Sequence, residues 1–261
     1  MRGSMATTHR VAIAQIAMHW TTRDNLAAML DAMQIAHSHG ARICAFSELA
    51  VTGFHRQIAR EATPAVVEPA IVNLRVRAAE LSLAIAVGAP TFSDDGRLFN
   101  SHLLVDERGQ IAAIVSKQGL TEPEATFFVA GWSRPVGRLQ GLKGSAVICR
   151  EVCDLERVSA QLPPGAADLV FVPGALRQDP DKPRTDPPHY VRDIQRLAAA
   201  TRAFVVQTNW PNALNRPEES VEGGSSCVAS PDGELLFRLP GQAAGVAIFD
   251  LGDREFVWRP R

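Results

Sequence analysis

Short runs of almost continuous apolar residues constrain the fold of this chain most strongly. The segments RICAF (42–46), LAIAVG (83–88) and DLVFVP (168–173) lack the polar alternation of a strand that has one face in water. Strands have such continuous apolar sequences when both of their faces are covered, as in parallel sheets. Helix-forming stretches separate these runs, so the pattern predicts an α/β protein.

The first half of the chain predicts a βαβαβ unit followed by a hairpin. Capping residues and apolar spacing give the element limits. Two further strands, joined by the polar turn DERG at 106–109, predict the hairpin. The expected elements are strands at 9–16, 42–46 and 83–88, helices from about Thr21 to His39 and from 66 to 82, and hairpin strands at 98–105 and 110–116.

The second half repeats this order of elements. Its final hairpin, CVASPDGELLFRLPG, is similar to LLVDERGQIAAIVSK in the first half. The expected elements are a helical turn at 122–128, strands at 136–139, 145–149, 168–173 and 203–207, helices ending near Leu162 and spanning 189–201, a hairpin at 226–239 and a strand at 245–251.

This order predicts a single domain over residues 9–261. Two mixed sheets packed face to face with helices outside, an α-β-β-α sandwich, accommodate it best. Residues 1–8 are expected to be a leader and a disordered start, because MRGS looks like an expression leader. The polar loop 177–188 is a candidate lid, and the tail 256–260 is expected to reach a partner chain.

Charge and cysteine content narrow the class of partner. Lys and Arg total 27 against 28 Asp and Glu, which argues against nucleic acid or an acidic membrane surface and favours a small, roughly neutral ligand. The sequence contains no run of about 18 apolar residues, the length that a membrane-spanning helix needs. Four scattered cysteines indicate a reducing compartment, so we expect a cytoplasmic protein.

One of these cysteines, Cys149, is expected at the carboxyl end of the strand 145–149. Ligands of open α/β sheets collect at such edges, and the start of a following helix favours a thiolate. An unpaired cysteine at the end of a buried strand is also a common core residue. Cys153 follows one helical turn later, so a metal-binding pair or a redox pair of thiols is an alternative. Because no histidine lies nearby in the sequence, we expect no metal. We expect a packing role for Cys153, as for Cys44 and Cys227.

Two other expected strands also end in chemically competent side chains, Glu48 and Lys117. Each residue alone is an ordinary strand cap or solvated strand end. Together with Cys149 they suit nucleophilic catalysis: the carboxylate takes the thiol proton, the ammonium stabilises a developing oxyanion, and the thiolate attacks.

These residues lie in blocks that resemble the nitrilase superfamily, the carbon-nitrogen hydrolase family. FSELAVTGF (46–54), KQGLTEPE (117–124) and ICRE (148–151) look like its three signature blocks in order, and the similarity extends from about residue 10 to 251. The resemblance implies an α-β-β-α sandwich that forms homodimers or higher homo-oligomers. It also implies a Glu, Lys and Cys triad at Glu48, Lys117 and Cys149, and a second acidic residue at Glu124.

The blocks depart from the family pattern at several positions. The family often has Pro at position 47, His at 119 and an aromatic residue at 150, where this chain has Ser47, Gly119 and Arg150. Instead of CDLE at 153–156 it frequently has RFPE. The shape of the substrate pocket is therefore not predicted by the resemblance.

The resulting hypothesis is a hydrolase that cleaves a small linear amide through a cysteine thioester, without a cofactor. Lys117 and the backbone N–H of Arg150 are expected to hold the oxyanion. Nitrile hydrolysis and removal of an N-carbamoyl group use the same triad and stay open, and Arg150, Arg177 and Arg192 are candidates to receive a substrate carboxylate. A non-catalytic member of the fold that binds a small molecule or a protein is the alternative from another class.

A nucleotide-binding α/β protein is a third reading. It fails because no glycine-rich turn follows the first strand, where the sequence is IAMHWTT (16–22).

Overall fold

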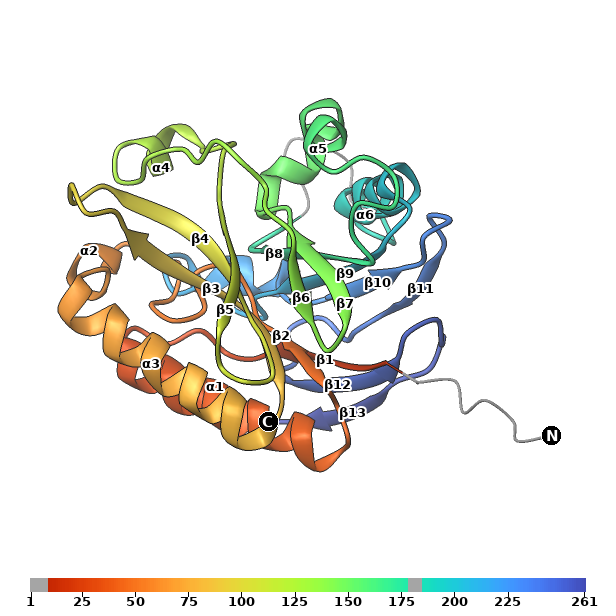
Figure 1. Cartoon of the computed structure of the whole chain (residues 1–261), viewed down its shortest axis with the longest axis horizontal. Helices are drawn as coiled ribbons and strands as arrows, with labels where there is room; N and C mark the ends of the chain where they lie inside the picture. Colours follow the sequence, from red (N-terminus) through yellow and green to blue (C-terminus); the bar gives the residue numbers. More distant parts are fainter. Residues whose placement is uncertain (1–8, 178–184) are drawn as a thin grey trace.

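The protein is an α/β sandwich of two mixed sheets that pack face to face with helices on their outer faces (Figure 1). The structure, a computed structural model, describes residues 9–177 and 185–261. The expected leader at 1–8 and most of the candidate lid, 178–184, lie outside the described residues. The fold class predicted from the strand pattern is confirmed.

The first sheet has the strand order β13-β12-β1-β2-β3-β4-β5. Its centre, β1 to β3, is parallel, and the remaining pairings are antiparallel. Its elements are β1 (Arg10–Gln15), α1 (Thr22–Ser38), β2 (Ile43–Ala45), α2 (Ile58–Glu61), α3 (Pro64–Leu81), β3 (Ala84–Phe92), β4 (Leu98–Val105), β5 (Ile111–Ser116), β12 (Gly245–Asp250) and β13 (Val257–Pro260).

The second sheet has the order β11-β10-β9-β8-β7-β6, with β7, β8 and β9 parallel. The short helix α4 (Glu122–Ala125) precedes it, and two 3-10 helices, η1 (Cys149–Cys153) and η2 (Pro217–Glu222), lie in its connections. Its other elements are β6 (Gly137–Leu139), β7 (Leu142–Ala146), α5 (Leu155–Gln161), β8 (Leu169–Gly174), α6 (His189–Thr201), β9 (Phe204–Asn209), β10 (Cys227–Ala229) and β11 (Leu235–Arg238).

Three apolar layers explain the continuous apolar strands. Residues such as Ile13, Phe171 and Val206 fill the space between the sheets. On the outer face of the first sheet, α1 and α3 contribute Met29 and Leu74. A corresponding cluster lies under α5 and α6 on the second sheet. Alternate residues of each strand thus enter different apolar layers, which removes the polar alternation.

One expected strand limit is wrong. The strand expected at 145–149 ends at Ala146, and Cys149 begins η1 with φ 54°. Pairing with β8 stops there because the N–H of Ile148 donates to the Glu151 side chain instead of to a neighbouring strand. The tail at 256–260, for which contact with a partner chain stays a prediction, forms β13 at the edge of the first sheet and pairs antiparallel with β12.

Within residues 9–177 and 185–261, no helix is both long enough and apolar enough to cross a bilayer.

Candidate functional site

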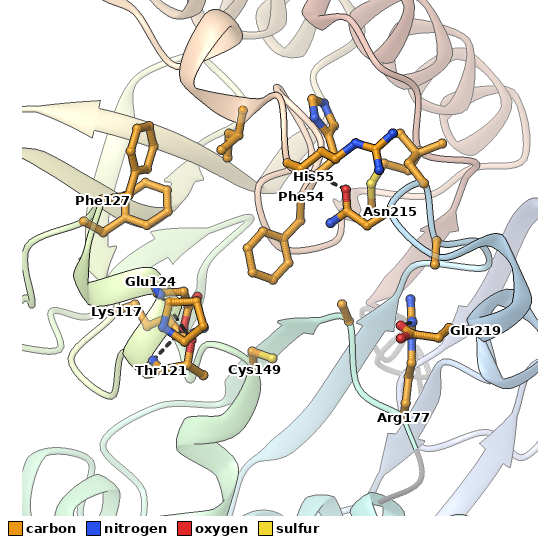
Figure 2. Close-up of a pocket in the computed structure, with 18 residues that line it drawn as sticks. Phe54, His55, Lys117, Thr121, Glu124, Phe127, Cys149, Arg177, Asn215 and Glu219 are labelled. Atoms are coloured by element: carbon orange, nitrogen blue, oxygen red, sulfur yellow. Dashed lines mark hydrogen bonds and ion pairs between the residues drawn. The ribbon is translucent and has the colours of Figure 1, made fainter. Parts of the chain in front are cut away.

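Glu48, Lys117 and Cys149 meet at one end of the sandwich, where both sheets contribute to a single site. Figure 2 shows Lys117 and Cys149 at this site. Glu48 follows β2 and Lys117 follows β5, and these strands run in the same direction within the first sheet. Cys149 comes from the second sheet, after β7. The carboxyl ends of strands therefore bring the three side chains together, as the sequence pattern predicts.

Lys117 lies between two buried carboxylates. Its Nζ atom is 2.7 Å from Glu48 Oε1 and 2.6 Å from Glu124 Oε1, and all three side chains are at most 3% exposed. Burial alone opposes the charged ammonium, but the negative charges of Glu48 and Glu124 outweigh it and raise the pKa of Lys117. The site thus holds a permanent cation beside the cysteine.

Asn100 of β4 also belongs to this cluster and has no signature in the sequence. Its Nδ2 donates to Glu48 Oε1 at 2.8 Å and to Glu124 Oε1 at 3.4 Å. In the described part of the chain, Glu48 Oε2 has no hydrogen-bond partner. Only long-range pairing of β3 with β4 carries Asn100 to the carboxylates, so no local pattern reveals it.

Glu124 is held in place by the first turn of α4. Thr121 is the N-cap, and its N–H and Oγ1 both donate to Glu124 Oε2, at 2.8 and 2.9 Å. This is a capping box, in which the third helical residue bonds back to the cap. The T-x-x-E spacing in KQGLTEPE is a sequence signal for this arrangement.

The Cys149 thiol opens on the site in the protonated state at neutral pH. Burial and the neighbouring Glu48 charge raise its pKa to about 12, and these effects exceed the opposing influence of Lys117. Its left-handed backbone conformation, φ 54°, is a strained one for a residue with a side chain. Attack by this sulfur therefore requires a base that removes the proton.

A cavity of about 530 Å³ lies in front of these groups. Its walls are mainly apolar, whereas charged side chains lie at the end away from Glu124: Arg177 forms an ion pair with Glu219 (Figure 2). Arg56 also lines the cavity, with its guanidinium over the ring of Trp20. The apolar wall includes Met18, Phe54, Ile58, Phe127, Phe128 and Leu214.

The other sequence candidates have different positions. Arg150 is exposed, and its Nη1 donates to the carbonyl of Leu120 in a separate hollow beside η1. Arg192 is exposed on α6 and does not line the cavity. Of the three arginines that are candidates to receive a substrate carboxylate, only Arg177 lines the cavity.

The remaining cysteines divide into buried and exposed residues. Cys44 and Cys227 are buried packing residues, as expected. Cys153 is exposed, with Sγ 3.8 Å from Asp193 Oδ2, so its expected packing role is wrong. Residues 9–177 and 185–261 contain no group of three or more His, Cys, Asp or Glu side chains able to hold a metal ion.

The sequence as a whole matches one protein family. The family model described as carbon-nitrogen hydrolase matches residues 10–255 of the chain. The chain therefore belongs to the carbon-nitrogen hydrolase family, and the resemblance seen in the three sequence blocks is confirmed.

Among solved structures, the chain is similar to an amidase from Nesterenkonia sp. Sequence identity is 27%, the match covers 95% of this chain and 92% of that one, and the TM-score is 0.80. A variant of that amidase in complex with butyramide has 28% identity, covers 94% and 91% of the two chains and has a TM-score of 0.79. In another variant the acetamide moiety of fluoroacetamide is covalently added at the active-site cysteine.

Two curated proteins are also similar in sequence. One is a "Hydrolase in pqqF 5'region" of Pseudomonas protegens, 26% identical, with the match covering 85% of this chain and 75% of that protein. The other is a glutamine-dependent NAD(+) synthetase of Acinetobacter baylyi, 23% identical over 88% of this chain. The match spans only 42% of the synthetase.

Proposed function

We propose that this protein is an amidase that hydrolyses small neutral amides through a thioester on Cys149. The observation that carries the proposal is the position of Lys117 Nζ between two buried carboxylates, in the wall of the cavity that Cys149 also lines. Such a cluster combines a nucleophile, a proton acceptor and a fixed cation, the three groups that acyl transfer needs.

In the proposed first step, Cys149 Sγ attacks the amide carbon while the Glu48 carboxylate takes the thiol proton. Glu48 Oε2 is the free acceptor for this proton, because Oε1 is already bonded to Lys117 and Asn100. Lys117 and the N–H of Arg150 stabilise the oxyanion. The tetrahedral intermediate collapses, the C–N bond breaks, and Glu48 returns its proton to the departing ammonia or amine.

In the second step, water attacks the thioester carbon and Glu48 again accepts a proton. Glu124 positions the water or the substrate beside Lys117. The C–S bond breaks, the acid leaves and the thiol regains its proton. Neither step requires a cofactor.

The substrate class follows from the cavity. Its apolar wall suits an aliphatic or aryl acyl group, and its volume of about 530 Å³ exceeds the needs of the smallest amides. Arg177 is already neutralised by Glu219. A substrate carboxylate would have to displace that ion pair, so neutral amides are preferred over amides of dicarboxylic acids.

The experiment that tests the function measures ammonia release from butyramide. The wild-type protein is expected to turn over, and Cys149→Ala should lose roughly a thousandfold or more of kcat. Cys153→Ala is the matched control and should keep wild-type activity, because that thiol is exposed outside the cavity. Undiminished turnover by Cys149→Ala would refute the assignment.

A wider panel separates the alternatives. Nitriles or N-carbamoyl amino acids hydrolysed faster than amides would move the protein to those branches of the family. Thermal stabilisation by butyramide without ammonia release from any of these compounds would favour the non-catalytic binding protein.

A further inference from the structure

The Glu151 side chain connects two turns of the backbone, the cysteine turn at 148–151 and the lysine turn at 117–119. It does so through four backbone and side-chain groups. Its Oε1 accepts from the N–H of Gln118 at 2.7 Å and of Gly119 at 3.1 Å, next to Lys117. Its Oε2 accepts from the N–H of Ile148 at 2.7 Å, next to Cys149. The Glu151 carboxylate thus accepts hydrogen bonds from Gln118, which follows Lys117, and from Ile148, which precedes Cys149.

The fourth group is the guanidinium of Arg134, which faces both oxygens of Glu151. Nη2 is 3.3 Å from Oε1 and Nη1 is 3.3 Å from Oε2, while Nη1 also donates to the carbonyl of Ala146 at the end of β7 at 2.5 Å. Both side chains are at most 3% exposed. The paired charge of Arg134 and the backbone donors lower the pKa of Glu151 against the effect of burial, so it stays an acceptor at neutral pH.

Gly119 fits this arrangement closely. A Cβ atom at this position would lie 3.2 Å from Glu151 Cγ, tighter than an ordinary contact. A side chain at position 119 would therefore require the Glu151 side chain to shift.

From these contacts we infer that Arg134 and Glu151 form a buried clamp that sets the distance between Lys117 and Cys149. Both are positioning residues, because neither lines the cavity in front of Cys149. The inference rests on the proposed function for its kinetic readout. Catalysis is sensitive to such positioning, since a shift of about 1 Å between reacting groups can cost roughly a hundredfold in rate.

The test compares Arg134→Met, Arg134→Lys and Glu151→Gln with the wild type on butyramide. Arg134→Met and Glu151→Gln are expected to lose roughly 10- to 100-fold in kcat with little change in KM. Arg134→Lys keeps the charge and should recover part of the loss. The double variant Arg134→Met/Glu151→Gln should be no slower than the slower single variant, because both substitutions break the same clamp.

A second readout does not depend on amide hydrolysis. Acrylamide adds to cysteine thiols, and the rate of its addition to Cys149 is measured by peptide mass spectrometry. The clamp variants should label more slowly than the wild type. Arg75→Met is the matched control: this half-buried arginine on α3 also bonds a backbone carbonyl, that of Gly109, but lies outside the cavity wall.

Each outcome decides a different point. Wild-type kcat and labelling rate in the folded variants, with only a lower melting temperature, would overturn the clamp and leave a purely structural ion pair. If Arg134→Met does not fold, Gly119→Ala perturbs the same carboxylate, and unchanged kcat and labelling there would overturn it equally. Wild-type protein that labels at Cys149 but hydrolyses no amide would refute the proposed function, while the labelling comparison still decides the clamp.

Discussion

At the scale of the residue, the proposed nucleophile is a thiol that its surroundings keep protonated. Burial and the Glu48 charge raise the pKa of Cys149 to about 12 even though Lys117 opposes them. A free thiol ionises near pH 8.5. The proposed chemistry therefore depends on proton transfer to Glu48 during attack and not on a preformed thiolate.

This raised pKa predicts a pH dependence of stability. The folded protein binds the Cys149 proton more tightly than the unfolded chain, so the stabilisation is complete below about pH 8.5 and is lost as the pH rises toward about 12. The melting temperature of the wild type, measured relative to Cys149→Ser, should decline from pH 8 to pH 11. A difference that does not vary with pH would show that the thiol is not shifted in this direction.

The ion pair of Arg177 with Glu219 predicts a change of substrate preference. In Glu219→Gln the guanidinium is free for a substrate carboxylate, and charge-assisted hydrogen bonds of this kind are typically worth about 1.5 to 3 kcal/mol. The ratio of kcat/KM for succinamate to that for butyramide should rise roughly tenfold. Glu218→Gln, an exposed neighbour outside the cavity wall, is the control and should leave the ratio unchanged.

At the scale of the element, strand β3 determines where the turn at 47–49, which carries Glu48 after β2, can lie. A Cβ atom on Gly88 would be 2.4 Å from the N of Leu49 and from the O of Ser47. The backbone after β2 crosses directly over this glycine, which is why no side chain fits there.

Replacing this glycine should displace Glu48. Gly88→Ala is expected to cost about 1 to 3 kcal/mol in the free energy of unfolding, as other overpacked substitutions do, and to lower kcat. Gly144→Ala is the matched control, because its nearest contact would be an ordinary 3.4 Å to Phe171. Denaturant unfolding and butyramide turnover measure both effects, and equal behaviour of the two variants would contradict the expectation.

At the scale of the whole molecule, the site depends on how the two sheets are joined. Trp210 follows β9 of the second sheet and is 1% exposed, and its Nε1 donates to the carbonyl of Glu48, after β2 of the first sheet, at 2.9 Å. This bond links the proposed base to the sheet that carries Cys149.

Trp210→Phe should therefore weaken both stability and turnover. The carbonyl of Glu48 loses a buried donor, which typically costs about 1 to 3 kcal/mol. Trp132→Phe serves as the control, since Trp132 is 73% exposed. Unfolding in denaturant together with kcat on butyramide tests the prediction, and a neutral Trp210→Phe would mean that the bond does not hold the turn.

Much of this molecule was predictable from local sequence. Continuous apolar strands between helices predicted the sandwich, because each strand lies between apolar layers on both faces. The meeting of Glu48, Lys117 and Cys149 was also predicted, because side chains that follow the carboxyl ends of strands with a shared direction face one cleft.

The tertiary structure alone decided the groups that arrange this edge. Asn100, Arg134 and Trp210 reach the site through strand pairing and sheet packing between segments far apart in the chain, and no local period records such contacts. The same reason explains the wrong limit at Cys149. Apolar character continues to Ile148, but the hydrogen bond from Ile148 to Glu151 ends the strand pairing, and the backbone turns into η1. The position of Glu151 depends in turn on its contacts with Arg134 and the lysine turn, which form only in the folded protein.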